Sequence, residues 1–201
     1  MFKKLLPSLF IALLALSASA QKTTPAKGAT PQPVPGPVSG EEIKWVSVND
    51  LPTLQAKQPR KFFIDVYTSW CGPCKMMMNN TFKDANVIKY VNENYYAVKF
   101  NAEGNDVIKF KGYEFTNPGY DPARASSRNS THDFTMAIAP VQTRIAYPTL
   151  VYFDETSTIL APIQGYFQPQ QLLPVLTYFK ENKHKENIDL NTYINEHLPK
   201  Q

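Results

Sequence analysis

The two cysteines of the chain, Cys71 and Cys74, are spaced for dithiol–disulfide chemistry. They are the only cysteines among 201 residues, and two residues separate them. A thiolate at one position can attack a disulfide in another molecule, and the second cysteine can then resolve the mixed disulfide. A structural zinc site usually needs four ligands, whereas the chain offers only this pair and three scattered histidines, so the pair predicts a redox centre rather than a metal site.

The residues around the pair predict a strand followed by the N-terminus of a helix. Residues 61–67 are rich in aromatic and β-branched side chains and lack polar alternation, as expected for a strand buried on both faces, whereas residues 74–82 have the composition of a helix. A cysteine just before a helix meets unpaired backbone N–H groups and the helix dipole, which stabilise its thiolate. We therefore predict Cys71 as the nucleophile, Pro73 in the first turn, and Cys74 as the more shielded resolving thiol.

Three segments resemble the thioredoxin-like family. Trp-Cys-Gly-Pro-Cys-Lys at residues 70–75 looks like the active site of thioredoxin. The strand before it matches the strand that leads to the active site in that family. Residues 81–87 are similar to a run in the thioredoxin-like C-terminal domain of bacterial thiol:disulfide interchange proteins, and residues 147–149 stand where the fold carries a cis-proline. The resemblance covers roughly residues 43–180 and implies an α/β thioredoxin fold: a central mixed sheet flanked by helices, with an insertion before the cis-proline.

Two charged residues, Asp65 and Lys99, interrupt segments that otherwise have the pattern of buried strands. A buried charge is costly unless it is paired or neutralised. In thioredoxin an Asp and a Lys stand at the matching positions beneath the disulfide. The resemblance thus implies that Asp65 has a raised pKa and takes the proton of Cys74, with Lys99 modulating its charge. The alternative is that both side chains point outward at strand edges.

The resemblance also assigns substrate contact to five residues beside the cysteines: Trp70, Gly72, Pro73, Tyr147 and Pro148. A cis bond at Pro148 keeps an N–H away from the sulfurs and leaves the backbone of Tyr147 available to a substrate strand, whereas a trans proline would simply begin a strand. Trp70 is either an exposed rim over the thiols or a packing residue. Tyr147 departs from the many relatives that carry Ile, Val or Thr at this position.

The chain before the resemblance divides into two parts. Residues 1–20 resemble an export signal, with two lysines, a short apolar run and an Ala-Ser-Ala cleavage site; an uncleaved anchor is the alternative. Residues 21–40 contain five prolines and predict an extended linker. Residues 41–201 are then expected to form one thioredoxin-like domain that is not embedded in the membrane. Without the two signal lysines, basic side chains exceed acidic ones by two, which gives no case for nucleic acid.

From residue 43 onward the pattern predicts alternating strands and helices. The expected strands are 44–48, 61–67, 95–101, 150–153 and 159–163. The expected helices are 49–58 with Asn49 or Asp50 as cap, 74–82, 85–94, 170–183 and 189–198. We expect Pro174 to kink the fourth of these helices or to delay its start.

Residues 104–133 form an insertion relative to the smallest thioredoxins. Prolines and glycines mark turns within it, and His132 is expected to begin a helix rather than to bind a metal. Long insertions in compact domains are often functional. This insertion either lies beside the thiols and selects a protein partner, or is a tolerated surface loop.

Together these features predict a thiol:disulfide oxidoreductase of the bacterial periplasm. It would act on protein thiols and disulfides without a cofactor beyond its own Cys71–Cys74 pair. The Gly-Pro dipeptide between the cysteines resembles reducing thioredoxins, so we expect reduction, with a membrane thiol:disulfide interchange protein as electron donor. The alternatives are a disulfide oxidase or isomerase that uses the same residues, and a redox-silent module that binds a partner.

Overall fold

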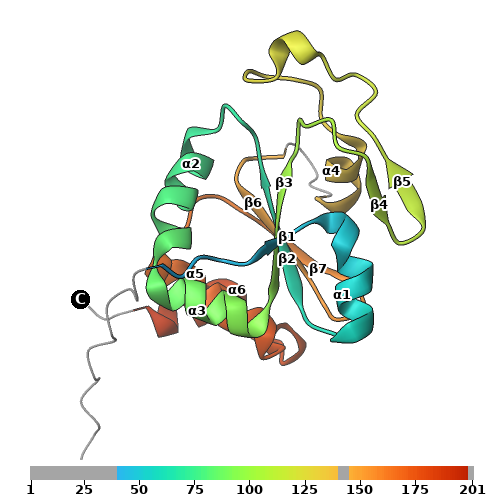
Figure 1. The fold of residues 1–201 in the computed structure, drawn as a ribbon. Helices are drawn as coiled ribbons and strands as arrows, with labels where there is room; N and C mark the ends of the chain where they lie inside the picture. The colour runs from blue at the N-terminus through green and yellow to red at the C-terminus, as the bar shows by residue number, and fades with distance from the viewer. Residues whose placement is uncertain (1–39, 140–144, 199–201) are drawn as a thin grey trace, which may run out of the picture. The chain divides into compact units, whose positions relative to one another are not determined.

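The computed structural model describes residues 40–139 and 145–198. The expected export signal and all but the last residue of the expected linker lie outside these ranges. Within them, a five-stranded sheet carries helices on both faces (Figure 1). This is the mixed α/β architecture expected from the resemblance.

The strands of the sheet follow the order β1-β3-β2-β6-β7. Their bounds are β1 (Trp45–Val46), β2 (Phe62–Tyr67), β3 (Tyr96–Asn101), β6 (Thr149–Phe153) and β7 (Ile159–Gln164). The pairs β1–β3 and β2–β3 are parallel, while β6 is antiparallel to both β2 and β7. The first strand is shorter than expected because Ser47 leaves it and accepts the N–H of Asn49, which caps a 3-10 turn.

The helices lie close to their expected positions. Their bounds are α1 (Leu51–Lys57), α2 (Gly72–Asn79), α3 (Ala85–Asn94), α4 (Asp133–Ile138), α5 (Pro169–Lys180) and α6 (Leu190–His197). The expected helix 74–82 is divided: α2 ends at Asn79, and Thr81–Lys83 forms a separate 3-10 turn before α3. Pro174 lies inside α5, which begins at Pro169, so the expected delay of that helix is wrong.

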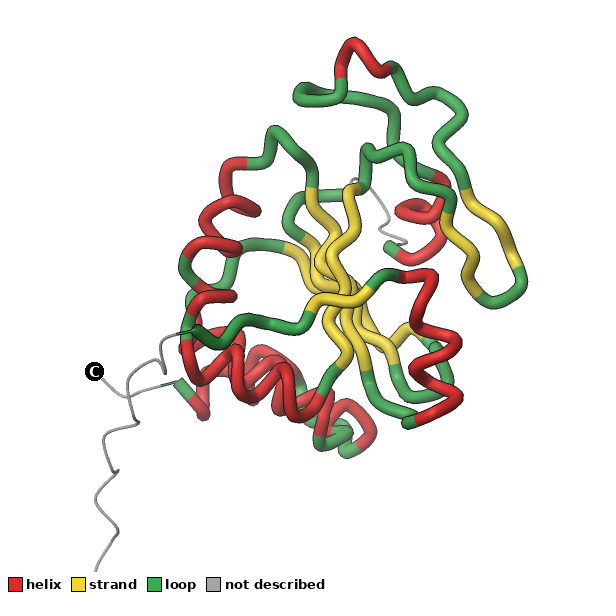
Figure 2. The backbone as a smooth tube through the Cα atoms, in the orientation of Figure 1, coloured by secondary structure: helices red, strands yellow, loops and turns green. Residues whose placement is uncertain are grey.

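Two hydrophobic cores lie on the two sides of the sheet. Successive side chains of a strand face opposite sides, so Phe62 and Ile64 pack towards α1 and α4, whereas Phe63 packs towards α2, α3 and α5. The backbone trace in Figure 2 shows these two helical layers with the sheet between them. The same alternation places Asp65 on the side of α2, the helix that carries the cysteines.

The segment between β3 and α4 contains a hairpin that the sequence analysis missed. Strands β4 (Ile108–Phe110) and β5 (Tyr113–Phe115) pair antiparallel through a turn in which Lys111 and Gly112 have φ of 51° and 81°. Positive φ at both central residues is the geometry of the tight hairpin turn, and the Lys-Gly pair was its only local signal. His132 caps α4 as expected, because its Nδ1 accepts the N–H of Phe134 at 3.0 Å.

Candidate active site

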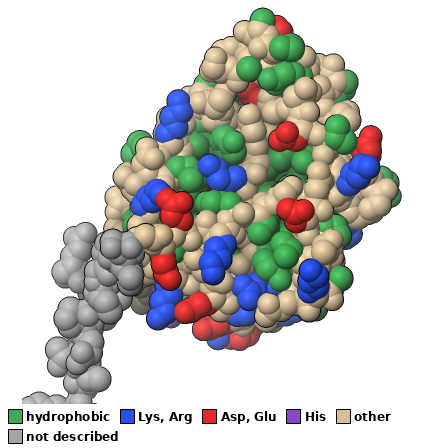
Figure 3. All heavy atoms as spheres, viewed as in Figure 1, with side chains coloured by type: hydrophobic (Ala, Val, Ile, Leu, Met, Phe, Trp, Pro, Cys, Tyr) green, Lys and Arg blue, Asp and Glu red, His purple; other side chains and the backbone are tan. Residues whose placement is uncertain are grey.

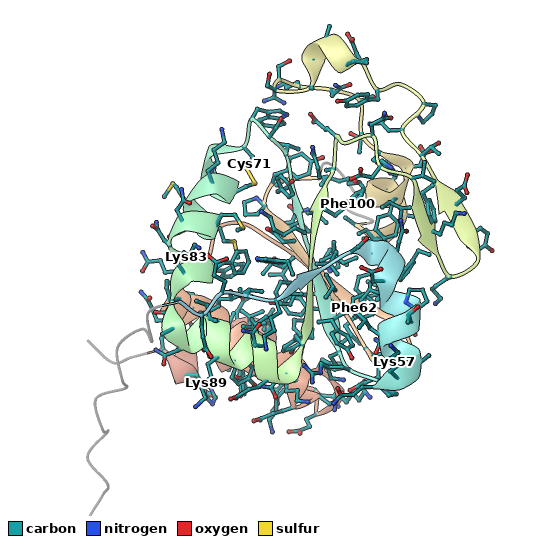
Figure 4. The ribbon with its side chains drawn as sticks, viewed as in Figure 1. Lys57, Phe62, Cys71, Lys83, Lys89 and Phe100 are labelled. Atoms are coloured by element: carbon teal, nitrogen blue, oxygen red, sulfur yellow. A yellow bond between two sulfur atoms is a disulfide. The ribbon has the colours of Figure 1, made fainter. Side chains whose placement is uncertain are left out.

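The cysteine pair lies at the N-terminus of α2. Cys71 is the residue that caps the helix, and its Sγ accepts the N–H of Cys74 at 3.1 Å. The two sulfurs form a disulfide of 2.08 Å, drawn as a yellow bond beside Cys71 in Figure 4. Gly72 and Pro73 are exposed and form the first turn, where the ring of proline fits without losing a hydrogen bond. The structure therefore places Cys71 where the backbone of a helix stabilises negative charge.

The two sulfur-bearing residues are equally shielded. Cys71 and Cys74 are each 3% exposed, so the expectation that Cys74 is the more shielded is wrong for this oxidised form. The disulfide holds the two sulfurs together within the first turn of α2. Both cysteines are therefore almost completely covered in the oxidised form.

Asp65 is buried below the helix and is 1% exposed, so the alternative of an outward carboxylate is wrong. Its Oδ1 has no hydrogen-bond partner among the described residues. Burial raises the pKa of Asp65 to about 7, and the nearby charge of Lys99 opposes part of this rise. The carboxyl therefore changes protonation near neutral pH, which suits a group that exchanges protons.

Lys99 is half-buried beside Asp65 in the pairing register of β2 and β3. Its Nζ lies 5.1 Å from the ring centroid of Tyr67 and 5.8 Å from that of Trp45. Lys99 and Cys74 both line a cavity of about 230 Å³. The lysine thus shares a cavity with Cys74 on the side of the sheet that carries α2.

Trp70 is a half-buried packing residue as well as a rim residue. Its Nε1 donates to Oε2 of Glu103 at 2.7 Å, and the guanidinium carbon of Arg128 lies 4.1 Å from its ring centroid. Its ring also meets that of Tyr147 edge to face, with centroids 6.0 Å apart. Glu103 and Arg128 were not singled out from the sequence, because no local pattern links them to residue 70.

The peptide bond between Tyr147 and Pro148 is cis, so the alternative of a trans proline is wrong. Pro148 is buried, and its carbonyl accepts the N–H of Gly165 at 2.9 Å. Thr149 pairs with Val66 in the register of β6 and β2. This pairing brings the proline next to the end of the strand that leads to Cys71.

Metal binding has no support in the part of the chain that the structure describes. Residues 40–139 and 145–198 contain no group of three or more His, Cys, Asp or Glu side chains suited to hold a metal ion. The Nε2 of His132 lies 2.7 Å from the carbonyl oxygen of Asp106, and its Nδ1 caps α4, so both ring nitrogens serve the fold.

A cysteine pair at a helix N-terminus, a buried acid on the preceding strand and a cis-proline on the adjacent strand define a thioredoxin-fold protein of the disulfide oxidoreductase type. The model of the thioredoxin-like domain family matches residues 48–180, and the chain belongs to this family. The redox group of such a fold is its own disulfide, and no separate cofactor is needed.

Several solved structures are similar to this chain. A thioredoxin-fold protein from Helicobacter pylori is similar, with 18% identity, a TM-score of 0.50, and coverage of 69% of this chain and 84% of that one. The matches also include a putative disulphide-isomerase from Bacteroides thetaiotaomicron, with 20% identity, a TM-score of 0.45, and coverage of 73% and 98%. The oxidised C-terminal domain of DsbD from Neisseria meningitidis matches with 14% identity, a TM-score of 0.41, and coverage of 66% and 89%. A search of curated proteins found no match.

None of the helices within residues 40–139 and 145–198 combines the length and the apolar character needed to cross a bilayer.

Proposed function

We propose that this chain is a thiol:disulfide oxidoreductase that reduces disulfides in exported proteins. The observation that carries the proposal is the Cys71–Cys74 pair at the N-terminus of α2, with the N–H of Cys74 directed at Sγ of Cys71. In the reduced protein this N–H and the helix dipole would stabilise a thiolate on Cys71. The thiolate is the form of cysteine that attacks a disulfide.

The reaction takes place in two exchanges. The thiolate of Cys71 attacks one sulfur of the substrate disulfide, a mixed disulfide forms, and the other substrate sulfur leaves as a thiolate. Cys74 then loses its proton and attacks the sulfur of Cys71. The Cys71–Cys74 disulfide forms and the second substrate thiolate leaves. The substrate gains two electrons and the protein loses two, which a dithiol donor must return before the next cycle.

Asp65 would accept the proton that Cys74 loses. Its burial and its pKa of about 7 support this role, because an acceptor works best when its pKa lies near the working pH. Lys99 would set how readily Asp65 ionises, since its charge opposes the effect of burial. Trp70, Tyr147 and Pro148 would meet the substrate at the mouth of the site, beside the exposed Gly72 and Pro73.

Export to the bacterial periplasm is part of the proposal. Residues 1–20 have the charge, apolar run and small-residue site of an export signal. The donor would then be a membrane thiol:disulfide interchange protein, because an oxidising compartment does not keep the dithiol reduced by itself. N-terminal sequencing of the protein purified from an expressing bacterium should find Gln21 as its first residue. A first residue at Met1 would contradict export by cleavage.

The test of the proposal combines a trap and a redox potential. Cys74→Ser should accumulate mixed disulfides with its substrates, visible as reducible adducts on gels, because the resolving thiol is missing. Cys71→Ser is the matched control and should trap nothing. Equilibration of the unmodified pair with a dithiol buffer should give a potential near that of thioredoxin, about −270 mV.

Two outcomes would replace the proposal by an alternative. A potential near about −120 mV, as in the strong oxidant DsbA, would make the protein an oxidase. If Cys74→Ser traps no adduct and Cys71→Ser still binds a partner protein, the chain would be a redox-silent binding module.

A further inference from the structure

Part of the insertion forms a projecting arm, residues 121–129, beside the loop that carries Cys71. The loop between β2 and α2 lies at one end of the sheet, and the arm extends beyond that end (Figures 1 and 4). In the space-filling view of Figure 3 the arm forms the top of the molecule. Residues 121–128 are all exposed. The two residues before Cys71, Ser69 and Trp70, both contact this arm.

Three contacts hold the arm against this loop. Oγ of Ser69 donates to the carbonyl of Ala125 at 3.1 Å. The guanidinium of Arg128 lies over the ring of Trp70 at 4.1 Å, within the range of a cation–π contact. Oε2 of Glu103 accepts both Nε1 of Trp70 at 2.7 Å and the N–H of Asn129 at 2.8 Å, so one carboxylate joins the loop to the arm.

The arm is also closed at its base. The side chain of Asn129 accepts the N–H of Asp121 at 2.9 Å and donates to the carbonyl of Asp121 at 2.8 Å. Just beyond, the amide of Asn117 donates to the carbonyls of Gly104 and Ser130, each at 2.9 Å. An arm fixed at its base and along one side loses little conformational entropy when a partner approaches, so it acts as a preformed wall.

The wall stands beside a recessed sulfur. Cys71 is 3% exposed, and a substrate sulfur must come within about 3.5 Å of Sγ before it can react. A narrow, mobile chain segment would enter beside Trp70 and the arm, whereas a disulfide set in the broad surface of a folded domain would meet the arm first.

We propose that the arm is a steric filter that admits disulfides on unfolded or flexible segments and excludes those fixed in the surface of folded domains. This inference rests on the proposed function and deepens it by naming the substrate class. The filter acts through the position of residues 122–128, and Glu103 and Arg128 are positioning residues that hold it in place.

The experiment presents one disulfide in two settings. A short disulfide-closed peptide is offered free in solution, and the same peptide is offered within a surface loop of a rigid folded carrier. The test variant replaces residues 122–128 with two glycines, which the bonds between Asp121 and Asn129 allow because they already close the base. Arg128→Ala is a milder second variant. Lys109→Ala is the matched control, since it removes a positive charge from the same insertion on an exposed side chain of β4.

The filter predicts a clear pattern of rates. The unmodified protein and the control should prefer the free peptide in kcat/KM by about tenfold or more. The shortened variant should lose this preference because its rate on the carrier rises, while its rate on the free peptide stays within about twofold. Arg128→Ala should lie between them. An unchanged preference in the shortened variant would overturn the filter, and so would a slower reaction with both substrates, which would show that the arm binds substrate.

A second measurement does not depend on reductase activity. In the Cys74→Ser background Cys71 is the only thiol, and its alkylation by free N-ethylmaleimide is compared with that by a maleimide fixed to the folded carrier. The carrier-bound maleimide should react slowly with Cys71 when the arm is complete and faster when the arm is shortened. If the ratio of the carrier-bound rate to the free rate is the same in both proteins, the filter is overturned. If neither disulfide substrate is reduced, the proposed function fails, and this alkylation ratio alone decides whether the arm filters. Thermal unfolding of each variant verifies that the fold is intact.

Discussion

A single carboxyl links the proposed chemistry to stability. Asp65 is fully surrounded by protein, and burial raises its pKa from 3.8 to about 7. Between these values the folded protein holds a proton that the unfolded chain has released. Stability therefore falls as the pH rises from about 4 to about 7, and the full penalty of burying the charge remains above pH 7.

Asp65→Asn should remove this penalty because the amide has nearly the same shape and does not ionise. At pH 8 the oxidised variant should be more stable than the unmodified protein by on the order of 3 kcal/mol, and the difference should vanish near pH 4. Urea unfolding of the oxidised proteins across this pH range measures the effect. If Asp65 also accepts the proton of Cys74, the variant should resolve mixed disulfides on the order of 100-fold more slowly at neutral pH.

Asp189 supplies a control of opposite sign. It lies at the surface, where hydrogen bonds from Thr192 lower its pKa, so its contribution is present at neutral pH and lost as the pH falls. Asp189→Asn should therefore lose stability at neutral pH, where Asp65→Asn gains it. A pH profile of Asp65→Asn parallel to that of the unmodified protein would show that the buried carboxyl does not titrate near pH 7.

At the level of elements, the aspartates that precede α1 and α3 serve their helices differently. Asp84 precedes α3, and its Oδ1 accepts the N–H groups of Asn86 and Val87 at 2.9 and 3.1 Å. Asp50 precedes α1 but makes no such bond with its side chain. The neighbouring Asn49, the other expected cap, instead bonds the carbonyl of Val107 and the N–H of Lys109. It anchors the inserted hairpin rather than the helix.

Asp84→Ala should destabilise the protein by about 1 kcal/mol, because two N–H groups of α3 lose their acceptor. Asp50→Ala should cost only a few tenths of a kcal/mol, since no capping bond is lost. Urea unfolding compares the two variants through their midpoints, with the slope of the unfolding free energy against urea concentration held the same. Equal losses would contradict the assignment of the cap to Asp84 alone.

At the level of the whole molecule, the two hydrophobic clusters of the described residues are built from residue 43 onward. Residues 21–40 carry five prolines and almost no large apolar side chain, so their composition offers little to bury.

A protein that begins at Glu41 should therefore unfold at the same temperature, within about 2 °C, as one that begins at Gln21. Both should reduce the free peptide disulfide at equal rates. Calorimetry and a turnover assay make the comparison. A lower midpoint or a slower reaction for the shorter chain would show that the proline-rich segment packs on the domain.

The sequence by itself determined the features that depend on neighbours along the chain. The Cys-Gly-Pro-Cys spacing predicts both the disulfide and its place at the start of α2, because a helix turn brings residues 71 and 74 together. The helix Ala85–Asn94 matches its expected bounds, since Asp84 caps its first turn from within the same segment. Asp65 could be predicted as a buried acid because its strand is apolar on both sides of it.

Only the tertiary structure decided how the insertion meets the site. Strands β2 and β3 run parallel, with Tyr67 opposite Asn101, so the segments that follow them leave the sheet at the same end. This brings Glu103 to Trp70 across 33 residues and lets the arm contact the loop before Cys71. No pattern within the insertion encodes such contacts, because they depend on which strands pair and in which register. The sequence therefore specifies the cysteine pair, and the fold decides which residues surround it.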